Sequence, residues 1–493
     1  MDGGPGLQSR LELRLYLAAE KLEFGCSVVP CLRKTRRHAI MYQEDQPGGR
    51  PLRRKQIHRF LLPFILLCEL ASLGSACRST ATPERVPTLP ARTPELPRTS
   101  APLPSPTVTP VLPDAPQPLT VWITELVSPL EGGDAARIFA QQIAAFEATH
   151  PGLNIQVLLK KPEGKGGIQD FLATASAVAP AVLPDLVALD TRFLPDVARK
   201  GLVVPLDGLF SPDIQEDLYP FAIQAGTVDE QLMGVQFEVS DIEHAIYNSS
   251  KITVAPLTWT EVFSIGATYI FPAAGQDGLV NDAFLIQYLS TGATLVDANG
   301  DPALDPEALT DVLQFYQQGV ERGAILTDVL SYATVENCWP KYLQAEVALS
   351  NISSDLYLAA MASDATAIPT RDGQAIALSQ GYAWALTTLD LDRQPLAVKL
   401  LEWLMNPASV AAWNQAVGHL PTRRAAFEQM TRDPYVAFMY HQLEYAMPYR
   451  SSEIHQRIYR AMQQAVDAVL RQRVPPEMAA ETVLEAVYHE TSR

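Results

Sequence analysis

The chain has 493 residues, enough for two or three domains, and a formal net charge of −17. That charge is uneven, because residues 1–118 contain 16 Lys and Arg against 10 Asp and Glu, whereas residues 119–493 contain 22 against 45. So acidic a body would be repelled by phosphate backbones, which argues against nucleic acid as a partner.

The first 40 residues precede a segment that has the properties of a secretory signal. They show no sustained hydrophobic period, and their charges are scattered. A secretory signal starts near the N-terminus, and Met41 stands just upstream of this one. We therefore expect translation to begin at Met41, with residues 1–40 assigned to the protein in error. A genuine N-terminal extension is the alternative.

Residues 41–77 are the predicted signal. A basic cluster at residues 53–59 precedes the apolar run 61–67, and small residues lead up to Cys77. The apolar segment is about a dozen residues long, shorter than the roughly 20 that a membrane-spanning helix needs. Its end resembles a bacterial lipobox, in which Cys77 would be lipidated, with Gly74 where Leu is usual. The alternative is an ordinary signal peptide cut nearby. Either one predicts export.

Residues 78–118 are predicted to form a disordered tether. Twelve of these 41 positions are proline, which fixes φ and lacks the N–H that helices and sheets need. Fully extended, such a spacer would hold the body on the order of 100 Å from an anchor. Beyond it the only cysteine is Cys338, so an exported body has no internal disulfide and depends on packing.

The body opens with alternating strand and helix patterns, from which we predict an α/β fold. Strands are predicted at residues 119–123, 154–159 and 184–189, and helices at 135–150, 168–179 and 192–200. Such alternation specifies a mostly parallel sheet with helices on both faces. Ligands of these sheets lie beyond the carboxyl ends of the strands, here residues 124–128 and 190–193. Near the C-terminus an apolar stripe predicts one helix over 454–469, and Pro475-Pro476 begins another.

The sequence carries none of the common catalytic or metal-binding signatures. The chain has no nucleophile elbow, zincin motif, Walker loop or dinucleotide turn, and its eight histidines include no pair at ligand spacing. The many carboxylates make any imagined glycosidase pair uninformative. We therefore expect no enzyme activity, no metal and no cofactor.

Several short motifs, in consistent order, resemble bacterial extracellular solute-binding proteins of the sugar type, the maltose-binding-like group. They are Phe146–Val157, Pro184–Val187 with Gly201–Asp207, Gly234–Phe237 with Tyr247-Asn248, Pro256–Glu261, and Gly381–Leu386 with Gly418–Arg423. The resemblance implies a two-lobed periplasmic-binding-protein-like fold with a hinge and C-terminal helices. Lobe one would comprise residues 119–236 and 379–425, and lobe two residues 241–375 and 426–493.

The resemblance also implies polar ligands for a solute held between the lobes. Asp190 and Arg192 follow a predicted strand where the family carries sugar-gripping residues, although a surface ion pair would explain them equally. Asp241 stands seven residues before Asn248, where the family has an acidic ligand; a solvated hinge carboxylate is the alternative. Glu125, after the first strand, is a further candidate and could instead be a loop charge.

Aromatic candidates are fewer. Trp339, in a predicted polar loop, could cap a sugar ring or pack between the lobes. Of Tyr382 and Trp384, strand alternation is expected to turn only one toward the cleft, and Tyr382 is favoured. Trp259 is expected to be structural. Ser353 lies in a loop that lacks the family's usual Trp, which weakens the expectation of a maltodextrin and favours a smaller or more polar solute.

The leading prediction is a lipid-anchored, exported solute receptor at the cell surface or in the periplasm. It would bind a sugar or oligosaccharide as a monomer and deliver it to the permease subunits of an ABC importer. Alternatives are a receptor for a polyamine, a glycerol phosphate or a peptide, a secreted carbohydrate-active enzyme, and a sensor that feeds a signalling partner.

Overall fold

A computed structural model describes residues 118–125, 133–266, 268–344, 346–360, 364–430 and 433–488. The predicted upstream region, the signal with Cys77 and nearly all of the tether lie outside these residues. Within the described ranges, none of the helices combines the length and the apolar character that crossing a membrane requires.

The first half of the body is built on a five-stranded sheet in the order β2-β1-β3-β13-β6. Its strands are β1 (Leu119–Thr124), β2 (Ile155–Lys160), β3 (Leu186–Asp190), β6 (Val235–Gln236) and β13 (Tyr382–Leu386). β1 pairs in parallel with β2 and β3, whereas β13 is antiparallel to both of its neighbours. The predicted mostly parallel sheet is confirmed, and the first three strands lie within two residues of their expected bounds.

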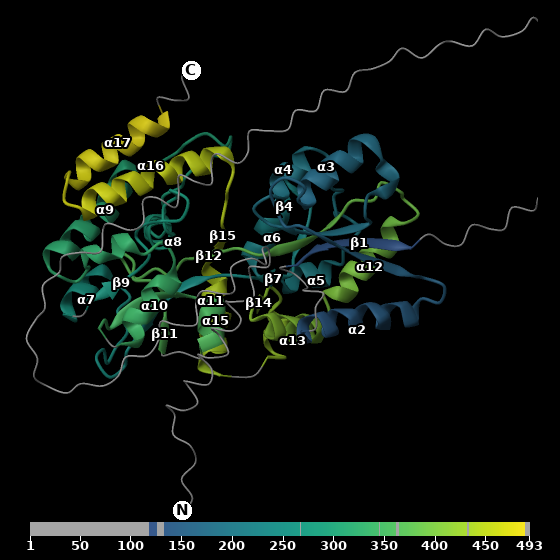
Figure 1. Cartoon of the computed structure of the whole chain (residues 1–493), viewed down its shortest axis with the longest axis horizontal. Coiled ribbons are helices and arrows are strands. Elements are labelled where there is room, and N and C mark those ends of the chain that lie inside the picture. Colours follow the sequence, from purple (N-terminus) through teal and green to yellow (C-terminus); the bar gives the residue numbers. More distant parts are fainter. Residues whose placement is uncertain are drawn as a thin grey trace, which may run out of the picture. The chain divides into compact units, whose positions relative to one another are not determined.

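Helices cover both faces of this sheet, as the alternating pattern predicted (Figure 1). The helices concerned are α2 (Asp134–Thr149), α3 (Ile168–Val178), α4 (Leu194–Arg199), α12 (Gln394–Leu404) and α13 (Pro407–Val417). Side chains of β1 alternate between two cores: Val121 and Ile123 join the core that includes α2 and α12, whereas Trp122 joins the one with α3 and α4. Both faces of the strand are therefore buried, which explains its unbroken apolar sequence.

The second half contains a four-stranded sheet in the order β11-β8-β10-β9. Its strands are β8 (Glu243–Tyr247), β9 (Tyr269–Ile270), β10 (Leu349–Ser353) and β11 (Asp364–Thr366). The accompanying helices are α7 (Trp259–Ser264), α8 (Asp282–Leu289), α9 (Pro306–Glu321), α10 (Val335–Leu343), α11 (Ser354–Ala360), α15 (Pro434–Gln442), α16 (Glu453–Leu470) and α17 (Pro476–Tyr488). α16 packs against α17 and α9, so both predicted C-terminal helices are present.

Short paired segments connect the two sheets. β7 (Glu238–Val239) pairs with β14 (Leu420–Pro421), and Asp241 forms an isolated bridge with Gln380. Next to that bridge, a Cβ atom on Gly381 would lie 2.1 Å from the carbonyl oxygen of Glu238, so only glycine fits there. The remaining elements are α5 (Pro212–Asp217), α6 (Pro220–Gly226), β4 (Thr227–Val228), β5 (Gln231–Leu232), β12 (Ala377–Ser379), α14 (Arg424–Phe427), β15 (Ala446–Pro448) and the 3-10 turns 180–182, 327–331 and 443–445.

A buried ion pair between Asp185, which precedes β3, and Arg393, which precedes α12, also contacts the start of β1. The side chain of Asp185 is 4% exposed and accepts hydrogen bonds from Arg393 Nε at 2.7 Å and from the backbone N–H of Thr120 at 2.8 Å. Arg393 also donates to the carbonyl oxygen of Pro118 at 2.8 Å.

We expect Arg393→Ala to lower the free energy of unfolding by roughly 3 kcal/mol, because Asp185 would remain buried without a cation. The matched control is Arg137→Ala, whose partner Asp134 lies 3.0 Å away in an exposed pair and should be worth less than about 0.5 kcal/mol. Urea unfolding of both variants tests this, and equal losses would contradict the role given to the buried pair.

Candidate functional site

One pocket, of about 400 Å³, is lined by residues that follow strands of both sheets. Glu163 and Arg192 come from the loops after β2 and β3, at the carboxyl ends of the five-stranded sheet where ligands are expected. Asp241, Glu243 and Ser353 come from the ends of β8 and β10 in the other sheet. A solute in this pocket would contact both halves of the body.

Arg192 is held in place by Asp190. Its Nη2 lies 2.6 Å from Asp190 Oδ2, and its Nε donates to the same oxygen at 2.9 Å. The backbone N–H of Arg192 also donates to Asp190 Oδ1 at 2.9 Å. Burial lowers the pKa of Arg192, but the hydrogen bond and charge of Asp190 outweigh it, so the pKa lies above its ordinary value. Asp190 itself does not line the pocket. It orients the guanidinium of Arg192, which does.

Three carboxyl groups, of which Glu243 is buried and Asp241 and Asp282 are partly exposed, line one side of the pocket. Burial, followed by the charges of Asp355, Asp282 and Glu336, raises the pKa of Asp241 well above its ordinary value. Burial, followed by the charge of Asp282, does the same to the pKa of Glu243. Burial also raises the pKa of Asp282 to about 6. These carboxyl groups therefore carry their negative charge at a free-energy cost in the unliganded pocket.

A hydrogen-bonded chain orients Glu243. Asn351 Nδ2 donates to Glu243 Oε1, and Asn351 Oδ1 in turn accepts a hydrogen bond from the hydroxyl of Tyr269 at 2.8 Å. Ser353, two residues further along β10, is buried and donates to Asp355 Oδ1. β10 thus positions two pocket carboxylates through side chains two residues apart, which lie on one face of the strand.

Of the residues predicted from the sequence, the pocket brings together Arg192, Asp241 and Ser353. Glu125 is exposed in the turn after β1 and does not line it. The pocket's other carboxylates were missed in the sequence. Asp241 and Glu243 stand two residues apart at the entry to a strand, and this spacing was a signal that could have identified Glu243.

The aromatic candidates lie elsewhere. The expectation that alternation separates Tyr382 from Trp384 is wrong, because residues two apart in a strand share a face. Both belong to the same buried core, where Trp384 stacks on Phe237 with ring centroids 4.9 Å apart. Burial raises the pKa of Tyr382 to about 12. Neither side chain lines the pocket.

Trp339 lies on helix α10 rather than in the predicted polar loop. Asn337 is the third residue of that helix and completes a capping box with Thr334, which explains why polar residues begin a helix here. Trp339 stacks on Tyr342 at 5.7 Å, while Thr334, Val335 and Glu336 from the helix start line the pocket.

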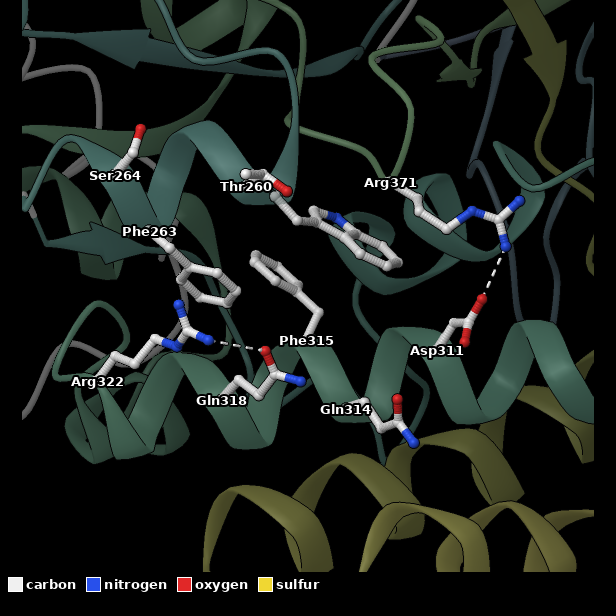
Figure 2. Close-up of a pocket in the computed structure, with 10 residues that line it drawn as sticks. Thr260, Phe263, Ser264, Asp311, Gln314, Phe315, Gln318, Arg322 and Arg371 are labelled. Atoms are coloured by element: carbon white, nitrogen blue, oxygen red, sulfur yellow. Dashed lines mark hydrogen bonds and ion pairs between the residues drawn. The ribbon is translucent and has the colours of Figure 1, made fainter.

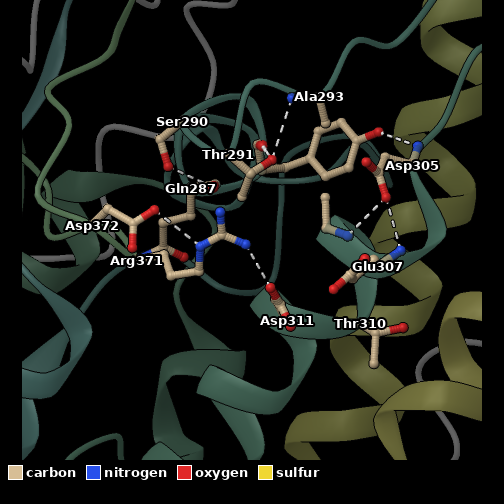
Figure 3. A network of polar contacts seen from close by, with 12 residues as sticks. Gln287, Ser290, Thr291, Ala293, Asp305, Glu307, Thr310, Asp311, Arg371 and Asp372 are labelled. Carbon is tan, nitrogen blue, oxygen red and sulfur yellow. Dashed lines mark hydrogen bonds and ion pairs between the residues drawn. The ribbon is translucent and has the colours of Figure 1, made fainter.

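A second pocket, of about 490 Å³, lies between α7 and α9 and belongs to the second half of the body only (Figure 2). Trp259 is the first residue of α7, and its ring stacks on Phe315 at 4.8 Å. Figure 2 shows the guanidinium of Arg322 beside Phe263, at 4.6 Å. At the other end Arg371 pairs with Asp311 at 2.7 Å and with Asp372 at 3.2 Å (Figure 3). The aromatic rings stack on one another or on Arg322, and Arg371 is paired with carboxylates. The residues of this pocket therefore have a role in packing.

Across the described ranges, no three side chains of His, Cys, Asp or Glu converge closely enough to hold a metal ion.

Comparisons with solved structures identify the fold. The cyclic α-maltosyl-1,6-maltose binding protein of Arthrobacter globiformis is 19% identical with a TM-score of 0.62, covering 76% of this chain and 98% of that one. The maltotriose-bound maltose/maltodextrin-binding domain of Bdellovibrio bacteriovorus is 17% identical with a TM-score of 0.53, covering 76% and 100%. These likenesses confirm the predicted two-lobed periplasmic-binding-protein fold.

Sequence comparison identifies the family. A binding protein of Brucella abortus (strain 2308) is 22% identical over 214 residues, 40% of this chain and 49% of the relative. The chain therefore spans about half the length of the curated relatives that it matches. The sequence model of the bacterial extracellular solute-binding proteins matches residues 141–437, more than half of the chain. The chain belongs to the bacterial extracellular solute-binding protein family.

Proposed function

We propose that the chain captures a polar solute, a sugar or oligosaccharide, in the pocket between its two sheets and delivers it to an ABC importer. The observation that carries this proposal is the pocket lined from both halves, with Arg192 on one side and Asp241 and Ser353 on the other. Proteins of similar fold are named for binding maltose-type sugars, which supports a saccharide ligand.

The two sheets would be the cores of two lobes. Lobe one would comprise residues 119–236 and 379–425, and lobe two 241–375 and 426–493. The paired segments around Asp241 and Gln380 would act as the hinge. A solute that contacts both lobes binds the closed arrangement better than the open one, and this difference in affinity shifts the equilibrium toward closure. The permease would recognise the closed form.

The proposed role is binding without catalysis, because the proteins that this chain matches are named as binding proteins. The receptor would be a monomer, exported by the signal at residues 41–77 and held at the membrane through Cys77 and the proline-rich tether. Mass spectrometry of the mature N-terminus tests this part. A lipidated Cys77 is expected, and an unmodified, cleaved end would contradict the anchor.

A thermal-shift screen of the purified chain against mono- and oligosaccharides, polyamines and glycerol phosphates tests the function. A saccharide at 100 times its Kd should stabilise the fold by about 2.7 kcal/mol. Arg192→Ala should abolish the shift, whereas Arg137→Ala, on an exposed helix face, should retain it. Hydrolysis of a glycan by the purified protein, or no shift with any solute, would contradict the proposal.

A further inference from the structure

The charges that line the solute pocket do not balance. Seven carboxyl groups line it, from Glu163, Asp241, Glu243, Asp277, Asp282, Glu336 and Asp355. Arg192 is the only cationic side chain among the lining residues, and it is already paired with Asp190 at 2.6 Å. None of the seven carboxylates forms an ion pair with another described residue. The lining is therefore strongly acidic, and the charge of Arg192 acts also on Glu163.

A second observation is independent of this charge count. Asp241 Oδ1 is fully buried and has no hydrogen-bond partner among the described residues. Glu243 is 9% exposed and accepts a hydrogen bond from Asn351 Nδ2. Buried carboxylates are normally paired and hydrogen-bonded because leaving them unsatisfied is costly. Asp241 has a backbone hydrogen bond with Ser354, and its Oδ1 is left to accept a donor supplied from outside the described body.

We propose that the solute of this pocket is a saccharide that carries a protonated amine, held by Asp241, Glu243 and Asp282. This inference rests on the proposed function and specifies its ligand. An ammonium group has three N–H donors and one positive charge, so it can donate to Asp241 Oδ1, which has no partner among the described residues, and to a second carboxylate beside it.

The rest of the pocket is suited to a polar ligand. Tyr449 is the only aromatic residue among those that line it, so it offers few ring faces of the kind that cover the apolar side of a neutral sugar. Arg192, Ser353 and Gln380 can exchange hydrogen bonds with hydroxyl groups. Charge and hydrogen bonding, rather than stacking, would therefore give this site its selectivity.

Protonation gives the interaction a characteristic pH dependence. Burial, followed by the charges of Asp355, Asp282 and Glu336, raises the pKa of Asp241. An ammonium favours the ionised carboxylates, so its affinity should rise with pH as they lose their protons. For Asp282, with a pKa of about 6, the rise should begin near pH 5 and continue until the pH at which the amine of the ligand loses its own proton. A neutral sugar lacks this coupling.

Calorimetric titration of the full chain with three matched ligands tests the inference: chitobiose with free amines, its N-acetylated form and cellobiose. The free amine should bind at least about 100-fold more tightly than either neutral ligand at pH 7, as is typical of a desolvated charge-assisted contact. Asp241→Asn should remove most of this preference. Asp372→Asn, in an exposed pair outside the pocket, should leave it intact.

The possible outcomes separate the inference from the proposed function. Equal or tighter binding of a neutral sugar would contradict the proposed preference for an amine, but it would agree with the proposed function as a sugar receptor. Binding of spermidine with no binding of any saccharide would support the ammonium contact but overturn the saccharide part and the sugar receptor with it. No binding by saccharides or spermidine would overturn both.

Discussion

Replacing Trp384 by alanine is expected to lower the free energy of unfolding by about 3 to 5 kcal/mol. The side chain is 2% exposed and lies on β13, between β3 and β6 of the five-stranded sheet. Its ring stacks on Phe237 at 4.9 Å and on Phe139, from α2, at 6.4 Å. Truncation would remove the contact of this ring with Phe139 on α2. It would also leave a cavity that the surrounding side chains cannot fill.

Urea unfolding followed by circular dichroism measures this loss. Trp403→Ala is the matched control, because that ring is 37% exposed on the neighbouring helix α12 and makes one hydrogen bond, to the carbonyl oxygen of Gln142 at 3.0 Å. It should cost about 1 kcal/mol. Trp384→Phe should recover part of the loss. Comparable costs for the two alanine variants would contradict the central place given to Trp384.

Asp282→Asn is expected to stabilise the unliganded protein by up to about 3 kcal/mol at neutral pH while weakening solute binding. The pKa of Asp282 is raised to about 6 in the folded protein, above its ordinary value near 3.8. The folded state therefore binds more protons than the unfolded state between these pH values, and the stability that this provides is lost as pH rises through about 6. Asparagine has no charge to bury, so it avoids the loss.

Thermal unfolding at pH 5 and pH 8 tests whether Asp282 lowers the stability of the wild type more at high pH than at low pH. The stability gain of Asp282→Asn over the wild type should be larger at pH 8 than at pH 5. Asp372→Asn, which alters an exposed pair with Arg371 at 3.2 Å, should stay within about 0.5 kcal/mol of the wild type at both. Saturating solute should reverse the ranking by stabilising the wild type alone. A variant less stable than the wild type at pH 8 would contradict the proposed cost of the buried carboxylate.

The local pattern of the chain was sufficient to predict much of the fold. Val121 and Ile123 are buried against one layer of helices and Trp122 against the other, so the continuous apolar run of β1 correctly indicated a strand covered on both faces. The prediction failed at Trp339, where polar residues were taken for a loop. There Thr334 and Asn337 use their side chains to cap a helix, so polarity marked the helix start.

The pocket was harder to predict because its walls come from distant parts of the chain. The place of Asp241 in the crossing segment indicates a ligand, but its negative neighbours Asp282 and Asp355 are brought near it only by α8 and α11. The spacing of residues along the sequence does not show that residues so far apart come together in the fold. The same limit applies to Asp190, whose position at the end of β3 indicates the site. Only the structure shows that it contacts Arg192 and does not line the pocket.

A crystal structure of the chain with the strongest binder from the solute screen would show whether both halves of the body hold the solute. We expect the ligand between the two sheets, with hydroxyl groups within hydrogen-bond distance of Arg192 and a nitrogen beside Asp241 and Glu243. A ligand seated instead in the pocket between α7 and α9, or bound against one sheet only, would contradict capture by the two halves of the body.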